Sequence, residues 1–404
     1  MNLVKKYLYY AFAIRILILS ILYFFFNGEI GGFSGDTYLK DDVRYAKGAL
    51  YYSQYANSII DDDAFTFAFE QFGDYTGYAE SFSLWYWFVC ITTYIFKSVL
   101  FLRIFNIVFA VLTAYYIYKL ASVIFNKKVG KYALLFYSFN PYFIFFSSFI
   151  YKDQFIALIT VQLFYYIYSY FISNKIKFIF YAIFLLVLFS FLRTGFSLIL
   201  TAFLIVLFFI KEKEYSKRFN LKVFVSFFIV FIISYYLITQ YIIDSYNAIQ
   251  EKLLVYVIER ANSETGSIAM FQISSLSDLY KLPFSFIFAL LQPINLTSKI
   301  SSVSGFVGII NVFGIFLASG NILAFFDKKI RSLNFTWIVN ALFIITLITS
   351  LGISRHYYFM LPFYVIFLSA YITKKDNLIK TIVSSTGLAL IIIVFYLFRN
   401  LLQW

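Results

Sequence analysis

The chain has 404 residues, of which 62% are hydrophobic and only 13% are charged, and its net charge is +13. Soluble globular domains are about half apolar and about a quarter charged, so this composition excludes that class and indicates a polytopic membrane protein. The basic residues lie in short clusters between apolar runs, which argues against a nucleic-acid-binding protein. The single cysteine, Cys90, excludes a disulfide framework and a cysteine-rich metal site.

The first predicted element is an apolar span over residues 7–26. A run of about 20 apolar residues is long enough to cross a bilayer as a helix. No small-residue cleavage site follows it. We therefore expect a permanent span rather than a cleaved signal peptide.

The basic clusters predict the topology, because short cytoplasmic loops carry an excess of lysine and arginine. The clusters are Lys5-Lys6, Lys127-Lys128 with Lys131, Lys175 with Lys177, residues 211–222, Lys328-Lys329 with Arg331, and Lys374-Lys375 with Lys380. With all of them in the cytoplasm, the chain forms a single all-α domain, 1–404, with a cytoplasmic N-terminus and an external C-terminus. The eleven predicted spans are roughly 7–26, 99–124, 132–150, 155–173, 178–192, 195–210, 223–242, 303–326, 334–352, 357–372 and 379–398.

This topology leaves two long external loops, residues 27–98 and 243–302. Each contains a short apolar segment, at 82–97 and at 280–296. A segment of this length is short for a membrane span, and if it did cross the membrane, the basic clusters that follow it would lie on the external side. We expect each segment to form a juxtamembrane helix at the interface.

The first external loop holds half of the 20 carboxylates of the chain. Three of them, Asp36, Asp41 and Asp42, follow the first span in the sequence GDTYLKDDVRYAKGALY. If residues 37–55 form a helix, Asp41 and Tyr45 share one face, whereas Asp42 lies about 100° around it. Only one of the two adjacent carboxylates can then point squarely at a substrate.

A second acidic run in this loop is Asp61-Asp62-Asp63. It could bind a divalent cation, but consecutive carboxylates rarely converge on one ion without a defined turn, so a solvated loop tip is the favoured interpretation. No cofactor follows from the sequence, and a metal requirement stays open.

Charged residues also lie at the external ends of the predicted spans, where an unpaired charge is costly and is a functional-site hypothesis by default. They are Arg103, Lys152, Asp153, Arg193, Arg355 and His356. Each of them could instead extend to the headgroups or pair with another member of the set. Pro141 lies inside the third span of the set and is expected to kink it.

Cations that face an acidic loop suit group transfer from a phosphorylated lipid. A lipid phosphate is a good leaving group that needs charge stabilisation, which arginine and lysine supply. An acceptor hydroxyl needs a carboxylate to take its proton. His356, the only histidine, could serve in acid–base catalysis or in a supporting position.

The sequence resembles the GT-C glycosyltransferases, especially glycosyltransferase family 39 and its bacterial relatives. The resemblance rests on DDVRYAKGAL after the first span, on the arginine-led second span beginning LRIF, on the proline and acidic residue of NPYFIFFSSFIYKDQF, and on FLRTGF. It covers roughly residues 1–210. The size, residue bias and two external loops also resemble the Wzy-type polymerases of O-antigen and capsule synthesis.

The resemblance implies a GT-C-like helical bundle that uses a polyprenyl-phosphate sugar at the external face and inverts the anomeric centre. Carried over by position, it implies that Asp41 is the catalytic base and that Asp42 stands in the place of a second acid. It also implies that Asp153 is the acid at the end of the third span, and that Arg103, Lys152 and Arg193 line the lipid-phosphate cavity.

We therefore predict an integral membrane enzyme, in a bacterial inner membrane, that transfers a sugar or oligosaccharide from a polyprenyl-(di)phosphate donor to a glycan or lipid acceptor on the periplasmic side. Repeat-unit polymerisation is an alternative activity. A transporter or flippase of lipid-linked oligosaccharide is the competing class, although transporters usually show matched halves, and this chain has no internal repeat. Partners in a polysaccharide assembly complex are also expected.

Overall fold

A computed structural model describes residues 3–25, 40–72, 84–209, 304–349, 358–374 and 377–402, together with residues 229 and 232. These residues form helices and contain no strand, which agrees with the predicted all-α class. The second external loop 243–302, its short helix 280–296 and the predicted span 223–242, apart from residues 229 and 232, lie outside the described part of the chain.

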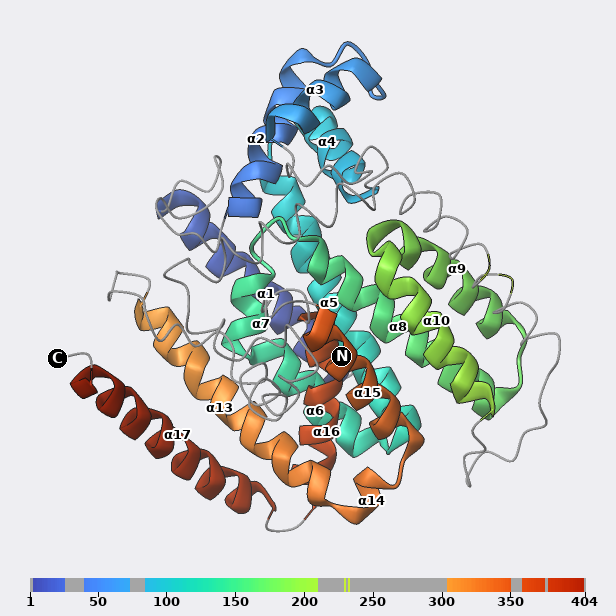
Figure 1. Ribbon diagram of the computed structural model, residues 1–404. Coiled ribbons are helices and arrows are strands. Elements are labelled where there is room, and N and C mark those ends of the chain that lie inside the picture. The colour runs from blue at the N-terminus through green and yellow to red at the C-terminus, as the bar shows by residue number, and fades with distance from the viewer. Residues whose placement is uncertain are drawn as a thin grey trace.

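Figure 1 shows the helices in chain order. They are α1 (Leu3–Phe25), α2 (Lys40–Tyr55), α3 (Asp62–Phe72), α4 (Leu84–Phe96), α5 (Leu100–Ile124), α6 (Lys127–Phe139), α7 (Pro141–Phe146), α8 (Lys152–Ser173), α9 (Lys177–Leu192), α10 (Thr194–Phe209), α13 (Ser304–Phe326), α14 (Lys328–Arg331), α15 (Asn334–Thr349), α16 (Leu361–Ile372) and α17 (Asn377–Leu402).

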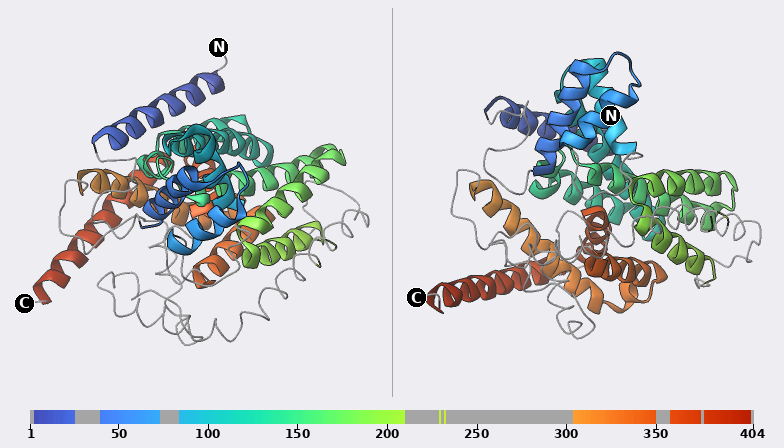
Figure 2. Two further views of the ribbon diagram at one scale, coloured as in Figure 1. Left: turned by 90° about the horizontal axis from the view of Figure 1, so that it is seen from above. Right: turned by 45° about the horizontal axis from the view of Figure 1, so that its top comes forward.

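The centre of the molecule is a bundle in which α5 packs against α6 and α8, and α8 packs against α9. Helix α1 lies against α5 and α6, while α16 contacts α6 and α13. Helix α17 extends along α13 at the edge of the bundle (Figures 1 and 2). Burial of apolar side chains from all these helices forms one continuous core.

Three described helices are long and apolar enough to cross a membrane, over Leu3–Phe24, Leu100–Ile124 and Lys152–Ser173. Shorter apolar helices include Lys177–Leu192, Asn334–Thr346 and Tyr358–Ile372. The helical content and these apolar segments support an integral membrane protein, and the number of eleven spans stays a prediction.

The close approach of α5 and α6 depends on Gly130. A Cβ atom at this position would lie 2.2 Å from Oγ of Ser122 and 2.7 Å from the carbonyl oxygen of Tyr118, both on α5. These distances are far below van der Waals contact, so only glycine lets the two helix backbones come this near. The turn between the helices is capped by Asn126, whose Oδ1 accepts the N–H of Val129 at 3.0 Å.

The predicted third span is broken rather than kinked. Helix α6 ends at Phe139 and α7 begins at Pro141. Between them, Oδ1 of Asn140 accepts the N–H of Tyr142 at 2.9 Å and so caps α7. Proline at the first position of a helix needs no donor, so Asn140 and Pro141 together start a new helix. The chain then runs without helix from residue 147 to residue 151.

Helices α2, α3 and α4 form a small unit that projects from one end of the bundle (Figures 1 and 2). Its core contains Tyr52, Phe65 and Tyr86, and the ring of Phe65 stacks on Trp87 with centroids 3.8 Å apart. Helix α4 is the short apolar helix expected at 82–97, and its buried face packs on α2. The described residues of the first external loop therefore form a folded unit with an aromatic core.

Asp61 directly precedes α3 in this unit. Its carboxylate accepts the backbone N–H groups of Ala64 at 3.0 Å and of Asn57 at 2.8 Å. These bonds lower the pKa of the Asp61 carboxyl. The neighbouring Asp62 and Asp63 are exposed in the first turn of the helix. Asp61 is thus a helix cap, and the acidic run forms the start of α3 rather than the tip of a loop.

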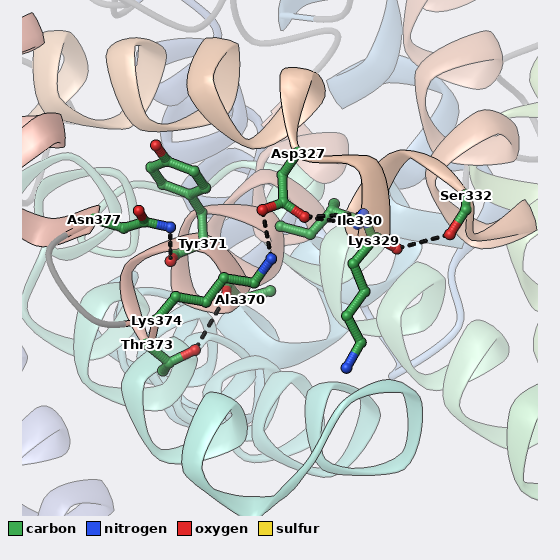
Figure 3. Close-up of polar contacts among 9 residues, drawn as sticks. All are labelled: Asp327, Lys329, Ile330, Ser332, Ala370, Tyr371, Thr373, Lys374 and Asn377. Atoms are coloured by element: carbon green, nitrogen blue, oxygen red, sulfur yellow. Dashed lines mark hydrogen bonds and ion pairs between the residues drawn. The ribbon is translucent and has the colours of Figure 1, made fainter.

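The opposite end of the bundle brings three basic clusters together. Nζ of Lys128 lies 3.5 Å from the carbonyl oxygen of Thr373, and Lys374 forms an ion pair with Asp327 (Figure 3). Asp327 also caps α14 by accepting the N–H of Lys329 at 3.0 Å. Burial alone would raise the pKa of the Asp327 carboxyl, but the hydrogen bond from Lys374 and those from the α14 backbone lower it overall. Clusters far apart in sequence therefore share one end, as the topology predicts.

Candidate active site

The acidic pair of the first loop occupies the first turn of α2. The buried positions Asp42, Ala46, Ala49 and Ser53 recur at helical spacing and form the face that packs into the protein. Asp41 lies about 100° around the same helix, off this face. The carboxylate of Asp42 is therefore directed inward by the helix itself.

Asp42 meets Arg103 of α5 in a fully enclosed ion pair. Nη2 of Arg103 donates to Oδ2 at 2.8 Å and Nη1 donates to Oδ1 at 3.3 Å. The Asp42 side chain has no exposed area and that of Arg103 is 4% exposed. The two-pronged geometry is the strong form of the arginine–carboxylate contact.

The same two residues also bind the non-helical segment before α8. The N–H of Ile150 donates to Oδ1 of Asp42 at 2.6 Å, and Nη1 of Arg103 donates to the carbonyl of Ser148 at 2.9 Å. Asn106, one turn after Arg103, donates to the carbonyls of Phe149 and Tyr151. Backbone groups that no helix satisfies are thus satisfied by side chains, as a buried irregular segment requires.

A second ion pair involves Asp153, three residues after Ile150. Nη2 of Arg193, which follows α9, lies 2.7 Å from Oδ1 of Asp153 in the first turn of α8. The guanidinium also lies over the ring of Phe359, 5.1 Å from its centroid. An acid in the first turn suits the helix dipole. The Arg193 and Asp153 side chains are 15% and 6% exposed, so this pair is more open than the first.

Next to Asp153, Gln154 is the centre of a buried polar cluster. Its Nε2 donates to the hydroxyl of Tyr137 at 3.0 Å, and its Oε1 accepts the hydroxyl of Tyr358 at 2.6 Å. Thr113 lies 3.5 Å from the same Nε2. These residues join α5, α6, α8 and the segment before α16, so the cluster fixes the N-terminal end of α8.

The structure places the predicted site residues in two groups. It brings together Asp42 with Arg103, and Asp153 with Arg193, while Lys152 is half-buried at the start of α8. Tyr45 is half-buried against Tyr86, with ring centroids 6.2 Å apart. Asp41 belongs to α2 by its backbone, and its side chain is outside the described set. Asp36, Arg355 and His356 lie outside the described residues.

Asn106 and Gln154 were not predicted as site residues. Both are amides in the apolar helices α5 and α8, and both are buried. The available signal was their polarity, because a polar side chain inside a span must find a partner. Their partners are backbone carbonyls and hydroxyls that no spacing rule specifies.

The arginines of the site can bind an anion. In the part of the chain that is described, no three His, Cys, Asp or Glu side chains lie close enough to hold a metal ion. Arg193 is the described arginine of the site that keeps some exposure while paired with a carboxylate. A phosphate group can replace such a carboxylate in the planar two-pronged contact that guanidinium favours.

Comparison with known proteins identifies the chemistry. The Alg9-like mannosyltransferase family matches residues 78–248 of the chain. The matched segment runs from α4 to beyond α10 and contains Arg103, Asp153 and Arg193, whereas Asp41 and Asp42 precede it. No curated protein matches the chain. The family match indicates a glycosyltransferase of the GT-C type and lends no support to the polymerase alternative.

Proposed function

Because the chain is a membrane glycosyltransferase of the GT-C type, we propose that it transfers a sugar or oligosaccharide from a polyprenyl-(di)phosphate donor to a glycan or lipid acceptor on the external face of a bacterial inner membrane. The product is a component of a cell-surface polysaccharide. Asp41 is the general base, and Arg193 with Lys152 binds the lipid phosphate. A lipid-linked donor is what the matched family fits; the face and the pathway are our proposal.

The observation that carries this proposal is the attachment of α2 to the start of α8. Asp42 accepts the N–H of Ile150, three residues before Asp153, while Asp153 pairs with Arg193. The first turn of α2 is therefore tied to the segment that leads into the second ion pair. Asp41 is adjacent to Asp42 in that turn of the backbone, and we assign the second carboxylate of the site to it.

Asp42 is a supporting residue in this proposal. Its carboxylate is fully buried and already accepts two arginine N–H groups and one backbone N–H. A general base must reach the proton of an acceptor hydroxyl directly or through one water. Enclosure of Asp42 leaves that task to Asp41.

The reaction then proceeds as a single displacement. Asp41 takes the proton of the acceptor hydroxyl while its oxygen bonds to the anomeric carbon, and the bond from that carbon to the phosphate oxygen breaks. The electron pair leaves with the lipid phosphate, whose charge Arg193 and Lys152 stabilise. Attack from the side opposite the leaving group inverts the anomeric centre, as the resemblance to the GT-C family implies.

The test is transfer by the purified chain in lipid nanodiscs. Polyprenyl phosphate carrying a radiolabelled sugar is supplied together with a glycan acceptor, beginning with mannose because the matched family contains mannosyltransferases. We expect one labelled product that is one transfer larger than the acceptor. A ladder of products would replace single transfer by polymerisation. Absence of transfer from every polyprenyl-linked sugar tried would overturn the proposal.

A further inference from the structure

Arg15 is a fully buried arginine in the middle of α1. It forms no ion pair with any carboxylate of the described residues. Its guanidinium instead donates to three backbone carbonyls: Nη1 to Ala11 at 3.1 Å and to Ser138 at 2.7 Å, and Nη2 to Tyr137 at 3.3 Å. A buried charge in an apolar helix is costly. The three carbonyl contacts indicate that the role of Arg15 is to bind these carbonyls.

The two carbonyls on α6 lack their usual helical donors. Pro141 has no N–H to give to the carbonyl of Tyr137, four residues before it. The N–H of Tyr142 goes to Oδ1 of Asn140, which leaves the carbonyl of Ser138 without it. Both carbonyls are at the C-terminal end of a helix, where the helix dipole favours a cation. Arg15 therefore supplies the donors and the charge that the break removes.

The break that Arg15 caps leads directly to the candidate site. After α7 the chain enters residues 148–151, which Arg103, Asn106 and Asp42 hold by their side chains. Helix α1 contacts both α6 and α7 (Figure 1). The chain from the end of α6 to the start of α8 is thus held at its beginning by Arg15 and at its end by the polar residues of α2 and α5.

We propose that Arg15 is a positioning residue for the glycosyl transfer proposed above: it stabilises the break at Asn140–Pro141 and so sets the path of residues 148–151, to which the catalytic turn of α2 is attached. This inference rests on the proposed function for its effect on turnover and on the structure alone for its effect on the segment. Arg15 does not bind the lipid phosphate, because its guanidinium is enclosed and occupied by carbonyls.

A double-variant cycle separates the effect of Arg15 on thermal stability from its effect on the path of residues 148–151. Arg15→Met removes the donors from both carbonyls. Pro141→Ala restores an N–H that the carbonyl of Tyr137 can accept, and it favours a continuous helix through the break. The combination Arg15→Met/Pro141→Ala should therefore recover thermal stability but not the path of residues 148–151. Arg15→Lys, which keeps a charged donor, serves as the conservative variant.

We expect Arg15→Met to melt at a lower temperature than wild type and to lose turnover by roughly 10- to 100-fold, since a displacement of about 1 Å has effects of that size. Donor affinity should change much less. Arg15→Lys should retain part of both properties. The double variant should regain the melting temperature and leave turnover low. Recovery of turnover together with stability would overturn the positioning role, as would wild-type turnover in Arg15→Met.

Hydrogen exchange gives a readout that needs no enzymatic activity. The N–H of Ile150 donates to Asp42, so it is protected only while the segment keeps its path. In Arg15→Met and in the double variant, exchange in a peptide covering residues 147–152 should speed up, while exchange in α9 stays at the wild-type rate. Unchanged exchange at 147–152 would contradict the inference even if the proposed transfer reaction were never observed.

Discussion

Replacement of Arg103 by methionine should be strongly destabilising, because it leaves the Asp42 carboxylate buried with a single donor. Arg103 provides two of the three hydrogen bonds that Asp42 accepts, and it also binds the carbonyl of Ser148. The Asp42 side chain has no exposed area. Loss of one partner from a buried ion pair costs about 3–5 kcal/mol. Asp42→Asn, which leaves the guanidinium charge unpaired, should be destabilising for the same reason.

The double variant Asp42→Asn/Arg103→Met should be more stable than Arg103→Met alone. It buries no net charge, and the amide oxygen of asparagine can still accept the N–H of Ile150. Residues in one hydrogen-bonded network do not contribute additively, so the two losses should partly cancel. The measurement is the free energy of unfolding in detergent micelles, from denaturant titrations followed by tryptophan fluorescence.

Lys374→Met is the matched control for this cycle. It breaks the ion pair with Asp327, in which the lysine side chain is 38% exposed. Solvent-exposed pairs contribute about 0–1 kcal/mol, so the loss should be small. The reasoning would be refuted if Arg103→Met cost no more than this control, or if the losses of the two single variants simply added in the double variant.

Three other predictions concern binding, pH and packing. Arg193→Met should weaken binding of polyprenyl phosphate by about 10- to 100-fold, since a charge-assisted hydrogen bond contributes about 1.5–3 kcal/mol, whereas Asp153→Asn should not weaken it; equal affinities in a filter-binding assay would contradict this role. The lowered pKa of Asp327 means that its carboxylate stabilises the fold above the usual aspartate pKa of about 3.9 and that this contribution is lost as the pH falls through the lower pKa of the folded protein. Thermal melts at decreasing pH should show a shallower acid limb for Asp327→Asn, and an unchanged limb would argue against the ion pair. Gly130→Ala should cost about 1–3 kcal/mol of stability by overpacking, while Gly387→Ala, with no atom within 4 Å of the new Cβ, should be neutral or stabilising; equal melting temperatures would contradict the packing at Gly130.

Much of the helical organisation could be predicted from the sequence, because apolar length and helical periodicity are local properties. The predicted helix at 37–55 is α2, over Lys40–Tyr55, and the expected short apolar helix at 82–97 is α4. Pro141 was expected to kink the third span, and the structure instead ends one helix at Phe139 and begins the next at Pro141. Pro141 was the correct signal, but the break also depends on Asn140 as a cap and on Arg15 from another helix.

The partners of the charged residues could not be predicted. The sequence identified Arg103, Asp153 and Arg193 as charges at the ends of spans, and pairing among the charges was one of its alternatives. That Arg103 pairs with Asp42, while Asp153 pairs with Arg193, depends on which helices are neighbours, and no local pattern encodes this. The burial of Asp42 could have been predicted, because its spacing from Ala46 and Ala49 places all three residues on one face of α2.

The most direct test of the account is the response of transfer to Asp41→Asn. Asparagine keeps the size and most of the hydrogen bonding of aspartate but cannot take a proton. In nanodiscs with a polyprenyl-linked sugar, we predict that turnover falls by at least about 10²-fold while donor binding and the melting temperature stay at wild-type values. Wild-type turnover in Asp41→Asn, with the loss appearing in Asp36→Asn or Asp42→Asn instead, would contradict the assignment of the base.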